Sequence, residues 1–197
     1  MTTPVTARDR AKAERTDAIL VAAAGLFAAR GYSGVSLEDI GAAVGVSGPA
    51  VYRHFAGKQA LLGALLIGVS EGLVSGGQRV LEDAAVPDVR MSMLVDFHVD
   101  FALRNADVIR VQDRDLAHLS PESLADVRRL QRAYIELWID TLSRLVPADR
   151  DALRLRVQAC FGLLNSTPHS TSAALRARPG TARLLQAMAM AALTARS

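Results

Sequence analysis

The residues that follow Val46 carry side chains suited to binding a polyanion. They are small, aromatic or basic, with no acid among them: Ser47, Gly48, Pro49, Ala50, Tyr52, Arg53 and His54. A helix that enters the major groove of DNA needs small residues that let it approach the base edges, and donors that reach phosphates. The pattern therefore predicts contact with double-stranded DNA. The alternative is a solvated helical hairpin within an all-α core.

Two other patterns resemble enzyme sites, but their settings do not suit catalysis. Residues 68–72 read Gly-Val-Ser-Glu-Gly, which matches the nucleophile elbow of hydrolases. That motif needs a sharp turn between a strand and a helix, whereas this stretch lies within a helical pattern. Asp96, His98 and Asp100 alternate along the chain, and on a helix such neighbours point to different faces. We therefore expect no catalytic residue, no metal ion and no cofactor.

Two short helices joined by a tight turn must position the DNA-facing side chains. Ser36 and Asp39 have the spacing of a capping box. Apolar residues then recur at helical spacing: Leu37, Ile40 and Val44. Gly45 follows where the chain must turn with a positive φ, and Ser47 can cap the second helix. Two helices with an apolar inner face and a glycine turn describe a helix-turn-helix.

The composition indicates an all-α protein. Half of the 197 residues are hydrophobic, and helix formers dominate while β-branched runs are scarce. The net charge is only +3, but residues 1–58 hold seven Lys or Arg against five Asp or Glu. The single cysteine, Cys160, rules out an internal disulfide. The chain opens without an apolar leader, and its longest apolar run (residues 60–69) is too short to span a bilayer. We expect a cytoplasmic protein that does not associate with a membrane.

The remaining pattern divides the chain into about nine helices. Apart from the helix-turn-helix, they are expected at residues 14–30, from 58 onward, and at 88–104, 106–118, 121–145, 148–167 and 180–195. Gly68, Gly72 and Gly76 repeat every four residues, which either allows close approach of a neighbouring helix or simply weakens this one. The expected organisation is a flexible arm (1–12), a DNA-binding domain (13–58) and a larger helical domain (59–197).

The helix-turn-helix and its flanks resemble the TetR family of transcriptional regulators. The matching segments are Phe-Ala-Ala-Arg-Gly-Tyr at 27–32, residues 36–47, Val-Tyr-Arg-His-Phe at 51–55, Lys58, and Leu61 with Leu62. They occur in the family's order and spacing over about residues 14–66. The resemblance implies a three-helix DNA-binding domain, a connecting fourth helix and a variable helical domain that binds a ligand and dimerises. One departure is Gly41, where the family usually has alanine.

By this resemblance, nine residues are expected to bind DNA: Ser36, Ser47, Gly48, Pro49, Ala50, Tyr52, Arg53, His54 and Lys58. Tyr52 and His54 would meet phosphates or a thymine methyl, and Lys58 would meet a phosphate. Arg53 and Ser47 would reach base edges or the backbone, and Ser36 a backbone phosphate. No long hydrogen-bonding side chain stands in the first turn of the second helix, so DNA shape would contribute to recognition. Each residue also has a plainer interpretation: Tyr52 in packing, His54 as a cation at a helix end, Lys58 as a solvated lysine.

The larger domain contains the residue types of a small-molecule pocket. The candidates are Met93, Phe97, Phe101, Tyr134, Trp138, Phe161 and Asn165, and His98 and His118 are further groups of suitable type among them. Pockets are mostly apolar with a few placed polar groups, and any helical core looks similar. The two last helices, at about 148–167 and 180–195, are apolar over much of their surface, so they must be central or lie at an interface. The resemblance implies that they form a homodimer contact.

These features predict a ligand-responsive repressor. A homodimer would hold a palindromic operator, and a small hydrophobic effector, such as a fatty acyl compound or a lipophilic drug, would release it. The alternative from another class is a helical small-molecule binding or carrier protein with an inactive DNA head.

Overall fold

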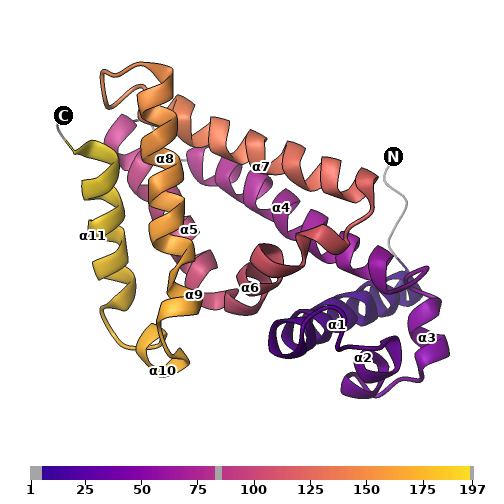
Figure 1. Ribbon diagram of the computed structural model, residues 1–197. Helices are drawn as coiled ribbons and strands as arrows, with labels where there is room; N and C mark the ends of the chain where they lie inside the picture. The colour runs from indigo at the N-terminus through magenta and orange to yellow at the C-terminus, as the bar shows by residue number, and fades with distance from the viewer. Residues whose placement is uncertain (1–5, 83–85, 196–197) are drawn as a thin grey trace.

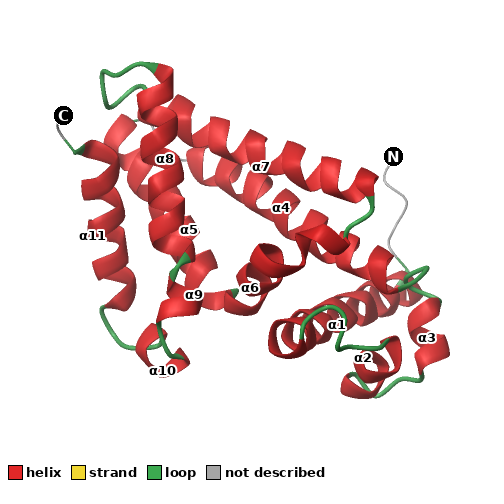
Figure 2. Ribbon diagram, viewed as in Figure 1, coloured by secondary structure: helices red, strands yellow, loops and turns green. Residues whose placement is uncertain are grey.

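The computed structural model describes residues 6–82 and 86–195, and within these residues all regular structure is helical (Figures 1 and 2). In chain order the helices are α1 (Ala7–Arg30), α2 (Leu37–Ala43), α3 (Gly48–Tyr52), α4 (Lys58–Glu82), α5 (Pro87–Arg104), α6 (Ala106–Asp115), the short 3-10 helix η1 (Leu116–His118), α7 (Pro121–Leu142), α8 (Arg150–Asn165), α9 (Thr167–Ser170), α10 (Ala173–Arg176) and α11 (Thr181–Thr194). The predicted all-α fold is confirmed.

The first three helices form a head at one end of the molecule (Figure 1). Its core is built from the apolar faces that the sequence pattern predicts, with Ile19, Phe27, Ile40 and Val51 fully buried. The same apolar cluster continues beyond α4 and takes in side chains of α6 and α7, including Val111. The head therefore shares its core with the rest of the chain, and the predicted domain boundary at residue 58 crosses a continuous apolar cluster.

The other helices form a larger body around a second apolar cluster. In Figure 1, α4 and α7 run side by side along the length of the body, while α8 and α11 lie at the end opposite α3. Trp138, Ile139 and Leu142 of α7 are fully buried in this cluster, together with Val157 and Leu164 of α8. The body therefore places the two last long helices far from α3.

Helix α4 connects the two clusters. Its first half contributes Leu61, Leu62 and Leu66 to the cluster of the head, and its end contributes Leu81 to that of the body. Within the described ranges, α4 is the one helix whose length and mean hydropathy of 1.6 would allow it to cross a membrane. Its apolar side chains are already used in the two cores, and 44% of that stretch is buried, so packing accounts for its composition.

Three expectations about helix boundaries need correction. Helix α1 begins at Ala7 and not at residue 14, because Thr6 and Asp9 form a capping box that starts it earlier. The predicted flexible arm is therefore helical over residues 7–12, and residues 1–5 of that arm lie outside the described residues. Two short helices, α9 and α10, were not predicted between the two last long helices.

The glycine repeat on α4 has both of the expected roles, at different positions. A Cβ built on Gly76 would lie 2.3 Å from Cζ of Phe97, so α5 approaches closely there. At Gly68 and Gly72 a Cβ would meet nothing within 4 Å. Close packing therefore explains Gly76, whereas Gly72 only weakens the helix.

Candidate DNA-binding surface and ligand cavity

The helix-turn-helix is held by a cap and by a glycine turn. The Oγ atom of Ser36 accepts a hydrogen bond from the amide of Asp39 at 3.0 Å, and the Asp39 carboxylate accepts one from the amide of Ser36 at 2.9 Å. Gly45 has a φ of 71°, as the turn requires. A Cβ on Gly41 would lie 2.8 Å from the carbonyl oxygen of Val46. The glycine at this departure from the family pattern therefore allows α2 and the turn to touch.

The outer face of α3 and its end is open to solvent. Ser47, Pro49 and Arg53 are exposed, Tyr52 is 55% exposed, and Ala50 is half-buried. The inner face is closed, since Val51 is fully buried. The exposed face thus carries small and aromatic side chains along α3 and the basic Arg53 at its end.

Two of the predicted DNA-binding residues differ from expectation: Gly48 is buried, and Ser47 does not form the expected helix cap. Gly48 is buried, and a Cβ there would lie 3.0 Å from Oε1 of Glu38, so its small size serves the packing of α2 on α3. Ser47 makes no side-chain cap to α3, which corrects the expected cap. Its hydroxyl remains available on the surface.

Lys58 and His54 tie parts of the head together. The Nζ atom of Lys58 donates to the carbonyl oxygens of Tyr32 and Val35, both at 2.8 Å, and lies 4.4 Å from the centre of the Tyr32 ring. The Nδ1 atom of His54 lies 2.9 Å from Oγ1 of Thr16 on α1. Sequence patterns could not reveal either tie, because each joins residues far apart in the chain.

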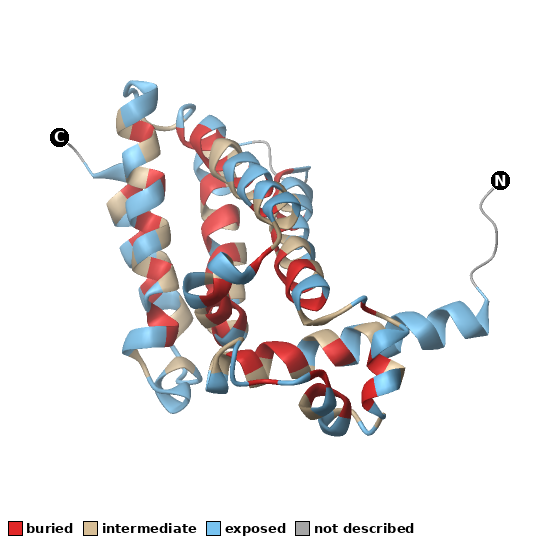
Figure 3. Ribbon diagram, turned by 45° about the vertical axis from the view of Figure 1, so that its right-hand side comes forward, coloured by how far each residue is buried: buried red, intermediate tan, exposed pale blue. Residues whose placement is uncertain are grey.

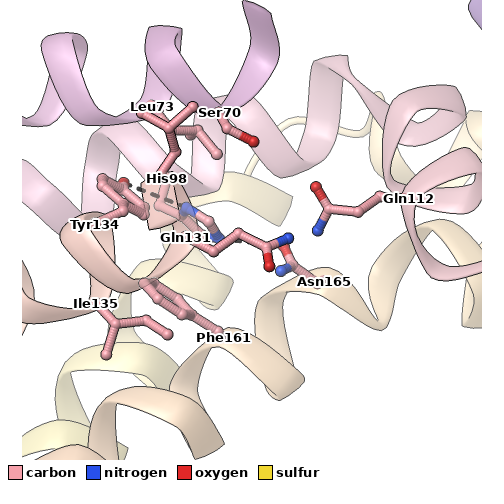
Figure 4. Close-up of a pocket in the computed structure, with 10 residues that line it drawn as sticks. Ser70, Leu73, His98, Gln112, Gln131, Tyr134, Ile135, Phe161 and Asn165 are labelled. Carbon is pink, nitrogen blue, oxygen red and sulfur yellow. Dashed lines mark hydrogen bonds between the residues drawn. The ribbon is translucent and has the colours of Figure 1, made fainter. Parts of the chain in front are cut away.

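The body contains a cavity of about 150 Å³. It lies between helices α4 to α8, and Figure 4 shows its side chains converging from these five elements. The lining residues are Ser70, Leu73, His98, Gln112, Leu130, Gln131, Tyr134, Ile135, Phe161 and Asn165. An apolar and aromatic wall with a few polar groups is typical of a small-molecule site.

Three of the polar groups form a directed chain. The Nε2 atom of His98 lies 3.1 Å from Oδ1 of Asn165, and its Nδ1 lies 3.4 Å from the hydroxyl of Tyr134. Burial lowers the pKa of His98 to about 4, and the bond to Asn165 offsets this only in part. Burial also raises the pKa of Tyr134. At neutral pH the hydroxyl therefore donates to His98, and His98 donates to Asn165.

These hydrogen bonds use the side-chain oxygen of Asn165 and leave its amide nitrogen as a free donor at the cavity. Among the described residues it has no hydrogen bond, and Figure 4 shows the amides of Gln112 and Gln131 near it. None of the described residues in the cavity wall carries a charge at neutral pH. The site is therefore neutral and presents amide groups to whatever enters it.

The structure brings three of the seven predicted ligand-binding residues into the cavity wall: Tyr134, Phe161 and Asn165. Trp138 and Phe101 lie behind that wall, each with its ring centre 5.7 Å from that of His98. Phe97 packs against α4 at Gly76, and Met93 is half-buried outside the lining.

The sequence analysis did not assign Ser70, Gln112 or Gln131 to the site, and it named His98 only beside the seven candidates. A signal for His98 was present, because it lies on the buried stripe of α5 together with Met91, Leu94 and Val95. A polar residue on such a stripe needs a partner inside the protein. Gln112 and Gln131 offered no such signal.

Comparisons with known proteins agree with the fold and cover both parts of the chain. Residues 19–65 match the family model of bacterial regulatory proteins of the tetR family, and residues 84–169 match that of the tetracyclin repressor-like C-terminal domain. A curated relative is the HTH-type transcriptional activator FasR of Mycolicibacterium smegmatis, 29% identical over 131 residues. That alignment covers 66% of this chain and 60% of FasR, which is less than two thirds of the relative's length.

Two solved structures show how widely the fold is shared. A TetR-family transcriptional regulator from Bordetella parapertussis has a TM-score of 0.80 at 24% identity, over 90% of this chain and 93% of its own. AibR, solved in complex with isovaleryl coenzyme A and operator DNA, has a TM-score of 0.72 at 20% identity, over 91% of this chain and 97% of its own. At these identities the likeness shows the fold alone.

Proposed function

The chain belongs to the TetR family of bacterial regulatory proteins, and we propose that it is a ligand-responsive transcriptional regulator. The observation that carries the proposal is the recognition surface. Helix α3 buries Val51 completely, while Ser47, Pro49, Tyr52 and Arg53 stand exposed without an acidic neighbour on that helix. A surface of small and basic side chains suits a helix that lies in the major groove.

A homodimer would place two such surfaces on one duplex. Leu155 on α8 and Leu184 on α11 are 68% and 62% exposed, and Met188 follows Leu184 by one helical turn. Exposed apolar residues on neighbouring helices support a self-complementary contact. Two heads related by a two-fold axis would bind a palindromic operator with half-sites about 34–36 Å apart.

The cavity supports a small effector that combines an apolar body with a hydrogen-bond acceptor. Aromatic walls favour the apolar part, and the free amide of Asn165 favours an acceptor such as a carbonyl oxygen. A volume of about 150 Å³ favours a short molecule. The acyl group of the ligand named for AibR has this chemistry, being short, branched and carrying a carbonyl oxygen.

Helix α6 could transmit the presence of the effector to the head. Gln112 lines the cavity, and Arg114, two residues later, donates to the carbonyl oxygens of Phe27 and Ala28 at the end of α1. A displacement of α6 by the effector would therefore change the position of the head. The effector would favour a conformer with a different spacing between the two recognition helices, and repression would end.

The alternative is a helical carrier in which the head does not bind DNA. The variant Arg53→Ala distinguishes a regulator from a carrier, because Arg53 is exposed and lies far from the cavity. The matched control is Arg144→Ala, since Arg144 is also exposed, on the loop after α7. A duplex selected from a random library by the full-length protein serves as the probe, and fluorescence anisotropy measures binding.

A regulator should lose about tenfold to a hundredfold in affinity with Arg53→Ala and nothing with Arg144→Ala. A carrier would select no duplex, and equal affinities for the wild-type protein and both variants would contradict the proposal. A regulator of this kind works where DNA is, so we also propose a cytoplasmic location.

A further inference from the structure

Helix α1 extends well beyond the core that it helps to build. Across residues 6–18 no side chain is buried, and residues 7–15 are exposed throughout. Figure 3 shows this half of the helix projecting from the molecule in pale blue. Isolated helical turns are marginally stable, and here the capping box at Thr6 and the contact of Thr16 with His54 hold them in place.

The charges on this extension are divided between two faces. Arg8, Lys12 and Arg15 follow one another at i, i+4 and i+7, so they share one face. Arg10 and Glu14, also four residues apart, lie on the opposite side. One face of the extension therefore carries three cations.

The basic face meets the end of the recognition helix. Arg8, Lys12 and Arg15 line a hollow of about 670 Å³ together with Arg53 and His54. Asp9 is the one acid among the described residues of that lining, and its carboxylate accepts hydrogen bonds from the amide and hydroxyl of Thr6 at 3.2 and 2.7 Å. Four arginines and lysines thus face one carboxylate.

None of these four cations forms an ion pair within the part of the chain that the structure describes. Like charges one helical turn apart weaken a helix, so the arrangement is unfavourable for the free protein and becomes favourable beside a polyanion. The stretch from Arg8 to Arg15 rises roughly 10 Å, which matches roughly three phosphates of one strand measured along the duplex axis.

We propose that Arg8, Lys12 and Arg15 form a second DNA contact, the α1 ridge, which binds backbone phosphates flanking the site occupied by α3. The α1 ridge rests on the proposed function, since it acts only if the head binds DNA. It reads no bases. It adds a contact that is independent of sequence and strengthens binding to operator and unrelated DNA alike.

The test compares the triple variant R8Q/K12Q/R15Q with R10Q, which removes a cation from the other face of the same helix. All four positions are exposed, so the fold is expected to survive, and circular dichroism checks it. Anisotropy titrations over a range of salt concentrations use the selected duplex and an unrelated duplex.

The triple variant should bind both duplexes about tenfold or more weakly, and the slope of log affinity against log salt should fall by about 2 to 3. R10Q should leave the slope unchanged. In the triple variant the ratio of the affinity for the selected duplex to the affinity for the unrelated duplex should stay constant.

A wild-type slope in the triple variant would overturn the α1 ridge while the proposed function stands. A fall in the ratio would show base reading and overturn the phosphate contact. Failure of the wild-type protein to select any duplex would overturn both proposals.

Discussion

Several residues of the head and of the cavity make contacts that differ from the usual role of their residue type. Lys58 would ordinarily be regarded as a phosphate ligand, yet its ammonium group holds two carbonyl oxygens of the loop before α2. Gly48 would ordinarily mark close approach to DNA, yet it is covered by Glu38. His98 is a buried histidine kept neutral by its surroundings. In each case a contact distant in sequence decides the role.

Gly41→Ala should damage the head, although alanine is the better helix former. The added Cβ would lie 2.8 Å from a backbone oxygen, so the turn itself must shift. Gly72→Ala, where the Cβ meets nothing within 4 Å, is the matched control and should stabilise the protein by about 1 kcal/mol. Thermal unfolding should show Gly41→Ala losing about 1–3 kcal/mol. An increase in stability like that of the control would contradict the role given to Gly41.

The lowered pKa of His98 should make the free energy of unfolding depend on pH. Its pKa is about 4 in the folded protein, against 6.5 for an exposed histidine, so the unfolded chain binds the proton more readily. Stability should fall as pH falls from 6.5 towards 4, by up to roughly 3 kcal/mol from this residue. Urea unfolding of the wild-type protein and His98→Gln over that range measures the difference. Equal slopes in the two proteins would contradict the assignment.

At the scale of the elements, the sequence predicted nearly every long helix because helical periodicity and capping are local properties. The helix-turn-helix is the clearest case, because the capping box of Ser36 and Asp39 marks the start of α2 and Gly45 marks the turn that follows it. The early start of α1 was missed because residues 7–15 contain no large apolar residue that would reveal a helical stripe. Which aromatic side chains line the cavity could not be predicted, because that depends on how five helices rotate against one another.

Helix α6 links the cavity with the head through the half-exposed Arg114, which pairs with the buried Asp115. Arg114 lies 3.0 Å from Asp115, a buried carboxylate that also lies 3.5 Å from the amide of Tyr32. Arg114→Gln should lower the free energy of unfolding by about 1–3 kcal/mol, because Asp115 loses its partner. It should also speed amide exchange at the end of α1. Arg128→Gln, an exposed arginine on α7 without a partner among the described residues, is the control. Identical exchange in both variants would contradict the link.

For the whole molecule, the two apolar clusters and α4 make the head and the body mechanically continuous. Side chains of α6 and α7 belong to the cluster that supports the head, so a change around the cavity need not travel through a flexible linker. The dimer contact proposed at α8 and α11 lies at the opposite end of the body (Figure 1). The body would therefore set the distance between two heads.

The dimer contact makes a prediction of its own. Leu184→Arg should yield a folded monomer, since Leu184 is 62% exposed and its removal leaves the protomer core intact. Val21→Arg on α1, at a residue that is also exposed and apolar, should remain a dimer. Sedimentation velocity measures both. A dimeric Leu184→Arg variant would place the contact elsewhere.

The central claim is that the exposed face of α3 selects a DNA sequence. Its most direct test is a fluorescence-anisotropy titration of the wild-type protein against the duplex that it enriches most from a random library, at two salt concentrations and with unrelated DNA as competitor. The account predicts tight binding that survives the competitor at both salt concentrations. Weak binding that is equal on both DNAs and disappears at the higher salt concentration would contradict it.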